Sequence, residues 1–531
     1  MSIALTTAAP AAAYDGPEPP ATGRWRPRPA LVAALLIVAG LAYRLYLTLN
    51  LTPPTNSDES TIGIAALHIA EGRDFPVFFY GQNHMGTIEA YLAAPLVAAF
   101  GPSVVALRLP MLALYVVFGF LMYRLTARLY SAWFAVFVVG LLAVGSQAVV
   151  RGEVFAGGGY PEIKPIGAGL LLLAVWLGSQ PKRGRLLGFA AWGLLAGLAV
   201  WTDWLILPYA GAAAVVLAVG CWRELLGRPG LLILAGLVVG ALPTIVHNVQ
   251  SGYADSTLAE MLYLSRNVHA SLDDRIQGGV LLGIPLATGL CEGAKCDGWP
   301  LAFGAVYPAL LLLAAGLALA ERGTKRAGRL ALVAGAALSI ILYTRSDGAG
   351  LSPATNVRYL TPLLLTLPAV LWPMWTAASR RWWRIPGITA LLIFALAMGK
   401  ATVDFVSTVD SGRAAARDEQ ALIAELERLG LTQIYSEYWT CGRLAFGSRE
   451  RIVCAALDDD LRPGRDRYLP YRTEVAAAAN PGYVLPIGST VERAFVERLH
   501  VEGVPATIDE IAGYRIYRPE VALGIPSMHT R

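Results

Sequence analysis

The sequence predicts an α-helical membrane protein that crosses the bilayer about eleven times and carries a small C-terminal α/β domain. Of its 531 residues, 55% are hydrophobic and only 15% are charged, whereas soluble domains average about 25% charged residues. The apolar residues form long blocks that short basic segments separate. These blocks end near residue 400 and short strand-like runs follow. A helical membrane domain over 30–399 and an α/β domain over 400–531 explain all three observations.

The first 29 residues are rich in Ala and Pro, and Arg24, Arg26 and Arg28 precede the first apolar block. This block is long enough to span the bilayer and lacks a convincing small-residue cleavage site. We therefore expect a disordered cytoplasmic tail over 1–29 and an anchoring helix after it. A cleavable signal peptide is the less favoured alternative.

The apolar blocks give the predicted spans. They are 30–49, 104–125, 133–150, 166–177, 186–200, 205–221, 231–246, 301–320, 330–343, 360–375 and 388–398. Several are shorter than the ~20 residues of a full crossing, so their ends are expected to extend into the flanks. A tight turn at Asp203 is expected between the fifth and sixth spans, since one long helix would hold this carboxylate at mid-bilayer.

The basic turns predict the orientation. With the N-terminus inside, the turns 124–128, 182–185, 223–228, 322–329 and 380–384 are cytoplasmic, as the positive-inside rule requires. The outer loops 50–103, 151–165 and 247–300 hold most of the acids. An odd number of spans leaves the C-terminal domain extracytoplasmic. A bacterial inner (plasma) membrane fits best, and the endoplasmic reticulum stays open. The arginines lie in short turns, so no nucleic-acid partner is indicated.

The cysteines give a second indication of topology. Four of the five fall in segments assigned to the outside. Cys291 and Cys296 flank a four-residue turn, and Cys441 and Cys454 lie on either side of a predicted strand turn. Two local disulfides in an oxidising compartment would explain this placement. A zinc site is less favoured because no histidine pairs with these cysteines at a zinc spacing.

The outer segments predict two architectures. In the first outer loop, 60–70 and 87–100 are amphipathic but too short and polar to span, so helices lying in the membrane interface are expected. The C-terminal domain combines an acidic helix pattern over 419–429 with strand-type runs. These runs are 433–435, 452–455, 483–486 and 514–517.

Two adjacent acids, Asp58 and Glu59, follow the first span directly. Taken alone, they are explained as loop residues that cap the helix starting near Ser60. The sequence motifs around these two acids indicate a role beyond capping. The first outer loop continues with a Gly81–Tyr91 segment, Arg108-Leu-Pro opens the second span, and Arg358-Tyr359-Leu-Thr-Pro362 opens a late one.

In order and placement these motifs resemble the GT-C glycosyltransferases, most closely the branch with protein O-mannosyltransferases and lipid A aminoarabinose transferases. The resemblance covers roughly 30–375. It implies a sugar donor linked to a polyprenyl phosphate and a glycan, lipid or protein acceptor whose hydroxyl attacks the anomeric carbon. By the same resemblance Asp58 is the general base, in agreement with general-base chemistry. Glu59 would support Asp58 or help to hold a divalent metal ion, and the sequence decides neither; no other cofactor is implied.

Several family members carry a lysine for the lipid phosphate in the segment that corresponds to His84–Gly86, where the local candidate in this sequence is His84. Because a histidine is neutral near pH 7, Arg358 is the first choice for the phosphate, through its forked geometry, and Lys164 is the second. Arg358 as a snorkelling residue at a helix end is the alternative. Glu89 and Tyr359 belong to the matching motifs and are further candidate substrate-binding residues.

The second outer loop holds three consecutive glycines, 157–159, which leave the backbone free to approach a ligand. Glu153, Tyr160 and Glu162 flank them as candidates for hydrogen bonds to sugar hydroxyls, with a plain flexible turn as the alternative. Asp203 lies between two tryptophans, a pattern that suits either sugar binding or an interfacial belt.

Two other functions compete with an enzyme. A transporter or flippase of lipid-linked sugars is less favoured because no paired halves with broken helices are visible. Charged residues within the spans are few, and the main one, Arg44, is expected to snorkel outward. A scaffold or sensor that displays the C-terminal domain would not need an elaborate first outer loop.

Overall fold

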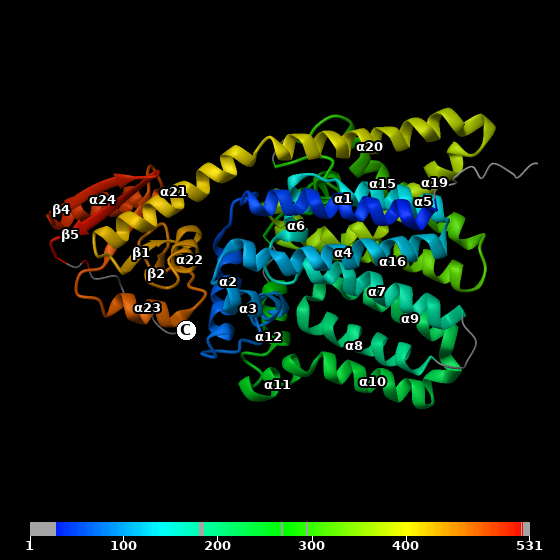
Figure 1. Cartoon of the computed structure of the whole chain (residues 1–531), viewed down its shortest axis with the longest axis horizontal. Coiled ribbons are helices and arrows are strands. Elements are labelled where there is room, and N and C mark those ends of the chain that lie inside the picture. The colour runs from blue at the N-terminus through cyan, green and yellow to red at the C-terminus, as the bar shows by residue number, and fades with distance from the viewer. Residues whose placement is uncertain (1–27, 180–184, 267–268, 294–295, 522, 524–531) are drawn as a thin grey trace, which may run out of the picture.

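The structure is a computed structural model that describes residues 28–179, 185–266, 269–293, 296–521 and 523. The expected disordered tail therefore lies outside the described residues, except for its last two positions. Apolar helices form most of the molecule, and a small sheet with its own helices lies at one end (Figure 1).

The helices in the first half of the chain are α1 (Pro29–Leu49), α2 (Ser57–Ala70), α3 (Ile88–Phe100), α4 (Val104–Leu129), α5 (Ala132–Ala143), α6 (Gln147–Val154), α7 (Tyr160–Ser179), α8 (Leu186–Thr202), η1 (Trp204–Ile206), α9 (Leu207–Leu225), α10 (Arg228–Gly240) and α11 (Leu242–Ser251). Those that follow are α12 (Thr257–Arg266), α13 (Leu272–Ile276), η2 (Gln277–Leu282), α14 (Gly283–Ala287), α15 (Trp299–Leu319), α16 (Gly323–Thr344), α17 (Asp347–Leu351), α18 (Pro353–Asn356), η3 (Val357–Thr366), α19 (Leu367–Ala378), η4 (Arg381–Trp383), α20 (Arg384–Val406) and α21 (Val409–Arg428).

The helices make this a multi-pass membrane protein. Within the described residues, 8 helices are long and apolar enough to cross a membrane, or up to 10 if each of two bent pairs is one span. The bent pairs are α5 with α6, at 90°, and α10 with α11, at 59°. An apolar helix coincides with every predicted span, but α8 has only 17 residues, so a total of eleven stays a prediction. The expected turn at Asp203 is present between α8 and η1.

The C-terminal α/β region, residues 429–521, contains one five-stranded sheet of order β2-β1-β3-β5-β4. Its elements are β1 (Gln433–Glu437), α22 (Tyr438–Gly447), β2 (Val453–Leu457), α23 (Leu469–Ala476), β3 (Gly482–Pro486), α24 (Thr490–Glu502), β4 (Ala506–Ile511) and β5 (Tyr514–Pro519). β1 pairs in parallel with β2 and β3, whereas β5 is antiparallel to β3 and β4. Strand β4 has no counterpart among the predicted runs, because most of its residues are polar or exposed.

Alternating side chains of the strands enter two cores, as the period of two requires. Ile434 packs with Leu422 and Leu426 of α21 on one face, and Tyr435 packs with Phe495 of α24 on the other. Helix α21 continues along nearly the same axis as α20, and these two helices together connect the membrane helices to the sheet (Figure 1). The sheet is thereby held over the loop end of the bundle that contains α2 and α3.

Several sequence-based expectations are wrong. Arg44 does not snorkel: its guanidinium is fully buried, with Nε 2.8 Å from Glu153 Oε2, because a carboxylate from α6 meets it inside the bundle. Glu153 is therefore engaged by a cation rather than free for a sugar. Cys441 and Cys454 do not flank a strand turn but lie in α22 and β2.

Helices form at both amphipathic stretches of the first outer loop, as α2 and α3. Almost all of α2 is buried, because it packs between α3 and α22 of the C-terminal region. Protein rather than lipid thus covers most of its surface. An interfacial position for these two helices stays a prediction.

Candidate active site

The candidate active site is built around the N-terminus of helix α2, which carries the adjacent acids Asp58 and Glu59. The side chain of Asn56 caps its N-terminus by accepting a hydrogen bond from the amide of Glu59 at 3.0 Å, which satisfies one of the free amide groups of the first turn. Asp58 and Glu59 lie in this turn, where the helix dipole favours negative charge. The capping role expected from the sequence therefore belongs to Asn56, and both acids are free for tertiary contacts.

Asp58 is buried and its carboxylate meets three partners from distant parts of the chain. One oxygen accepts hydrogen bonds from the Tyr438 hydroxyl and from Nη2 of Arg467, the latter at 3.1 Å. The other lies 3.3 Å from Nη1 of Arg358. Burial alone would raise the pKa of Asp58, but Arg467, Tyr438 and Arg358 together lower it below the ordinary value. Asp58 is therefore ionised at neutral pH.

Glu59 points away from Asp58 into the protein. Both its oxygens accept hydrogen bonds from Arg108 of α4, at 2.7 and 2.6 Å, and neither side chain is exposed. A second bond from Arg108 Nη2 reaches the carbonyl of Pro53 at 2.9 Å. The arginine that the sequence analysis placed in a motif thus fixes the start of α2 to α4.

A cavity of about 700 Å³ opens in front of Asp58. Its wall combines α2, α6, the start of α7, the disulfide loop at Cys291, η3 and the first turn of α22. The polar lining includes Asp58, Arg151, Tyr160, Glu292, Arg358 and Trp439. The wall thus carries two guanidinium groups and two carboxylates, of which Asp58 is paired with Arg358. A polar site of this size suits a ligand that has both charged and hydrogen-bonding groups.

Arg358 and Tyr160 meet in this wall. The guanidinium carbon of Arg358 lies 5.8 Å from the Tyr160 ring and 5.5 Å from the Tyr359 ring, within the range of cation–π attraction. Nε of Arg358 is buried and has no hydrogen-bond partner among the described residues. Arg358 therefore holds Asp58 with one nitrogen and has donors to spare for a ligand.

Lys164 does not line the cavity. Its buried ammonium donates to the backbone carbonyl of Tyr160 at 3.0 Å and to that of Gly152. Gly152 and Tyr160 both belong to the cavity wall. Lys164 therefore supports the wall from behind, and its bonds are directed at backbone rather than at a ligand position.

The three-glycine loop is a packed turn and not a flexible one. The amides of Gly158 and Gly159 both donate to the buried carboxylate of Glu89, at 3.0 to 3.2 Å. Both glycines have φ near +97°, a conformation that side chains disfavour. Of the three, only Gly157 lines the cavity. The expectation that this backbone is open to a ligand is thus wrong for Gly158 and Gly159.

Glu162 and Asp203 also lie behind the wall. Glu162 is buried beside Glu89, and Asp203 accepts from the amide of Leu205 at 2.9 Å, which caps η1. Neither lines the cavity. These residues belong to the support of the glycine loop.

His84 lies near the C-terminal region. Its Nδ1 is 3.8 Å from Glu260, and burial together with Arg465 and Arg467 lowers the pKa of His84 to about 4. The imidazole is therefore neutral at pH 7, as expected, and it does not line the cavity.

The sequence analysis missed five residues of this site, one of which is Glu292 in the Cys291–Cys296 loop. Tyr438, Trp439 and Arg467 come from the C-terminal region, and only the cluster of aromatic residues after β1 hinted at the first two. Arg151 was visible in the second outer loop but received no role. Its guanidinium lies 4.4 Å from the Phe155 ring, inside the wall of the cavity.

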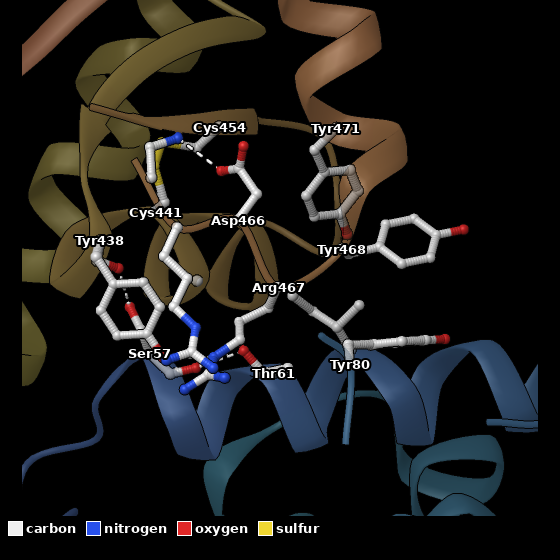
Figure 2. Close-up of a pocket in the computed structure, with 14 residues that line it drawn as sticks. Ser57, Thr61, Tyr80, Tyr438, Cys441, Cys454, Asp466, Arg467, Tyr468 and Tyr471 are labelled. Atoms are coloured by element: carbon white, nitrogen blue, oxygen red, sulfur yellow. Dashed lines mark hydrogen bonds between the residues drawn. A yellow bond between two sulfur atoms is a disulfide. The ribbon is translucent and has the colours of Figure 1, made fainter. Parts of the chain in front are cut away.

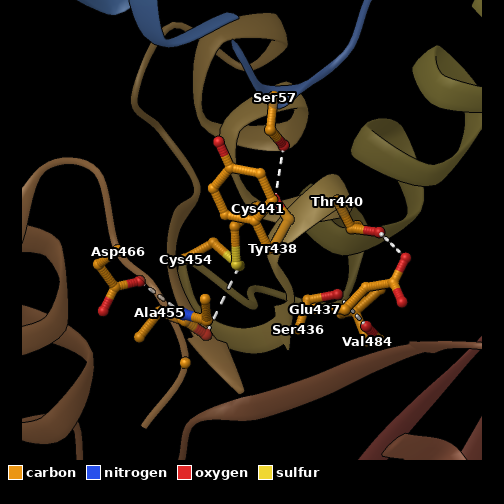
Figure 3. Close-up of a disulfide and its surroundings, with 12 residues drawn as sticks. Ser57, Ser436, Glu437, Tyr438, Thr440, Cys441, Cys454, Ala455, Asp466 and Val484 are labelled. Atoms are coloured by element: carbon orange, nitrogen blue, oxygen red, sulfur yellow. Dashed lines mark hydrogen bonds between the residues drawn. A yellow bond between two sulfur atoms is a disulfide. The ribbon is translucent and has the colours of Figure 1, made fainter. Parts of the chain in front are cut away.

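Both disulfides lie close to the cavity. The structure pairs Cys291 with Cys296 and Cys441 with Cys454. Glu292, inside the first, lines the cavity and accepts from the amide of Gln147 at 2.7 Å. The second ties α22 to β2, immediately after Tyr438 and Trp439 (Figure 3).

The carboxylates at the site do not suit a divalent metal ion. The oxygens of Asp58 and Glu59 already face arginines. In the described part of the chain, no three or more His, Cys, Asp or Glu side chains are grouped as metal ligands.

The fold that carries this site is that of the GT-C glycosyltransferases, so the expected likeness is confirmed. ArnT from Cupriavidus metallidurans, bound to undecaprenyl phosphate, aligns with a TM-score of 0.61 at 13% identity, over 92% of this chain and 97% of that chain. The Archaeoglobus fulgidus oligosaccharyltransferase AglB, in complex with an inhibitory peptide and a dolichol-phosphate, aligns with a TM-score of 0.50 at 12% identity, over 92% of this chain and 74% of that chain. No protein-family model and no curated protein matches the sequence.

Proposed function

We propose that this protein is a membrane glycosyltransferase that moves a sugar from a polyprenyl-phosphate-linked donor to an acceptor hydroxyl. The observation that carries the proposal is the ionised carboxylate of Asp58 at the wall of the 700 Å³ cavity, beside Arg358. The GT-C fold supports it, since ArnT and AglB with this fold were solved with undecaprenyl phosphate and dolichol-phosphate.

The two arginines of the cavity are suited to the donor phosphate. Arginine forms two parallel hydrogen bonds to phosphate oxygens and keeps its charge at all relevant pH values. Arg358 has a buried nitrogen without a partner in the described structure, and Arg151 stands in the same wall. Together they would stabilise the charge that grows on the phosphate as it leaves.

The reaction then runs in one displacement. The acceptor oxygen attacks the anomeric carbon, and the bond from this carbon to the phosphate oxygen breaks. Asp58 takes the hydroxyl proton, and polyprenyl phosphate leaves with the bonding electrons. Because the pKa of Asp58 is low, proton transfer is favourable only late, when bond formation has made the hydroxyl acidic.

We further propose that the cavity faces the extracytoplasmic side of the inner membrane. The Cys291–Cys296 loop contributes Glu292 to the cavity wall, and Cys441 of the second disulfide lies in the same helix as Trp439 of that wall. Disulfides persist in oxidising compartments. The positive-inside rule, which assigns the short basic turns to the cytoplasm, supports the same orientation. The sugar is left open, and the acceptor is a glycan, a lipid or a protein.

The test is sugar transfer from a set of radiolabelled undecaprenyl-phosphate sugars to membrane acceptors, with purified wild type, Asp58→Asn and Asp410→Asn. The control Asp410 is exposed and remote from the cavity. We expect transfer by wild type and the control, and a loss of about 100-fold or more in Asp58→Asn. Full activity of Asp58→Asn would overturn the assignment of the base. Movement of lipid-linked sugar across vesicles without donor consumption would replace the enzyme by a transporter.

A further inference from the structure

The C-terminal α/β region supplies two of the three partners of Asp58. Tyr438 opens α22 and Arg467 lies in the loop before α23, so both stand more than 370 residues from Asp58 in the sequence. Nε of Arg467 also donates to the Tyr438 hydroxyl at 2.7 Å. The three side chains thus form a closed triangle across the junction between α2 and the C-terminal region.

This triangle is held from both sides. The Arg467 guanidinium lies 4.7 Å from the ring of Phe79, in the first outer loop. The Ser57 hydroxyl donates to the carbonyl of Tyr438 at 2.6 Å, and a Cβ on Gly442 would lie only 3.0 Å from the Ser57 carbonyl oxygen. The start of α2 therefore lies in close contact with α22, beside a small pocket that Ser57, Tyr438 and Arg467 line (Figure 2).

We propose that Tyr438 and Arg467 are positioning residues for Asp58, so that the docked C-terminal region completes the active site. This inference rests on the proposed function. The two donors fix the direction of the carboxylate and keep it ionised, because hydrogen bonds and a neighbouring cation favour the charged form. Among the described residues, Arg358 is the partner of the other oxygen, and both Arg358 and Asp58 line the cavity.

Every charged or titratable group near Asp58 enters the expected pH dependence. From the C-terminal region, α6, α7 and η3 these groups are Tyr438, Arg465, Arg467, Arg151, Tyr160 and Arg358. The variants below remove the hydrogen bonds from Tyr438 and Arg467, and Arg467→Met also removes the guanidinium charge. The midpoint of the acid side of the kcat/KM–pH profile should move to higher pH, because Asp58 then binds a proton more readily.

The experiment compares kcat/KM at pH 5 and pH 7 for wild type, Tyr438→Phe, Arg467→Met and Arg467→Lys. Tyr468→Phe is the matched control: its ring lies 4.9 Å from those of His68 and Tyr80 at the same junction, and within the described residues its hydroxyl makes no hydrogen bond. Thermal unfolding in detergent establishes that each variant is folded.

We expect this midpoint to rise by about one pH unit or more in Tyr438→Phe and Arg467→Met. The ratio of kcat/KM at pH 5 to that at pH 7 would then fall below the wild-type ratio, with Arg467→Lys nearer to wild type. Wild type and Tyr468→Phe should keep their ratio. Unchanged ratios in folded Tyr438→Phe and Arg467→Met would overturn the proposal.

A second readout separates this inference from the proposed function. The rate of carbodiimide labelling at Asp58, followed by mass spectrometry against pH, reports protonation of this carboxyl without turnover. A midpoint that rises in Tyr438→Phe while Asp58→Asn is active would keep the positioning role and reject Asp58 as base. An unmoved midpoint together with an inactive Asp58→Asn would reject the positioning role alone.

Discussion

Arg108 holds Glu59 in a buried, two-pronged ion pair, with Nε and Nη2 at 2.7 and 2.6 Å from the two carboxylate oxygens. Neighbouring residues on a helix point about 100° apart, so Asp58 meets the cavity while Glu59 meets α4. Two adjacent acids therefore have different tasks. One belongs to the proposed chemistry, and the other fixes the helix that carries it.

Breaking this pair should cost stability. Glu59→Gln leaves the buried Arg108 charge without its counter-ion, which typically costs about 3–5 kcal/mol. The measurement is the SDS-induced unfolding midpoint in detergent, with Asp410→Asn, at an exposed position, as the control that should change it far less. A Glu59→Met, Arg108→Met double variant should lose less than the two single variants combined. A Glu59→Gln protein that is as stable as wild type but inactive would instead give Glu59 a role in the reaction.

Neighbouring glycines should differ in their tolerance of alanine. A Cβ on Gly159 would lie 3.0 Å from that of Asp203, at a φ of +97°. On Gly157 it would find its nearest atom at 3.6 Å. We expect Gly159→Ala to lower the unfolding midpoint by the equivalent of about 2 kcal/mol, and Gly157→Ala to be nearly neutral. Equal effects of both would contradict a tightly packed loop.

Arg358 should govern donor affinity. Loss of a charged hydrogen bond costs about 1.5–3 kcal/mol, so Arg358→Gln should raise the KM for the lipid-linked donor by about 10- to 100-fold. The exposed Arg345 provides the control variant Arg345→Gln. A donor KM that stays at the wild-type value in Arg358→Gln would remove Arg358 from the phosphate site.

The junction between α2 and the C-terminal region should weaken in acid. Glu450 accepts hydrogen bonds from His68, Arg73 and Tyr471. Although burial raises the pKa of Glu450, these partners lower it to about 2. The stabilisation is therefore complete above pH ~4.5 and is lost as pH falls toward 2.

The variant Glu450→Gln should be less stable than wild type at pH 6, and its unfolding temperature should fall less between pH 5 and pH 3. Glu474→Gln, at an exposed position of α23, is the matched control. Parallel pH curves for wild type and Glu450→Gln would show that this carboxylate does not carry the effect.

The two disulfides should differ in what they contribute. They close sequence separations of 13 and 5 residues, for which chain entropy predicts about 3 and about 2 kcal/mol. Replacing Cys441 and Cys454 by serine should therefore lower the unfolding temperature more than replacing Cys291 and Cys296. Activity should also fall with the first pair, because α22 carries Tyr438. Greater damage from the second pair would contradict this.

The sequence by itself determined the membrane class, the position of each apolar helix and the place of Asp58 at the head of α2. These follow from local properties: the length of an apolar block, the pair of acids directly after it, and the period of strand residues such as Ile434 and Tyr435. It also indicated Arg358, because a short motif at a helix start is visible without tertiary contacts.

Only the tertiary structure decided which charges pair. Arg44 met Glu153, Arg108 met Glu59, and the glycine loop met Glu89, each across tens of residues that no local pattern connects. Tyr438 and Arg467 joined Asp58 because α21 carries the sheet back over the first outer loop. Buried charges are costly unless they are paired, so the packing of distant elements determines which acids stay available for chemistry.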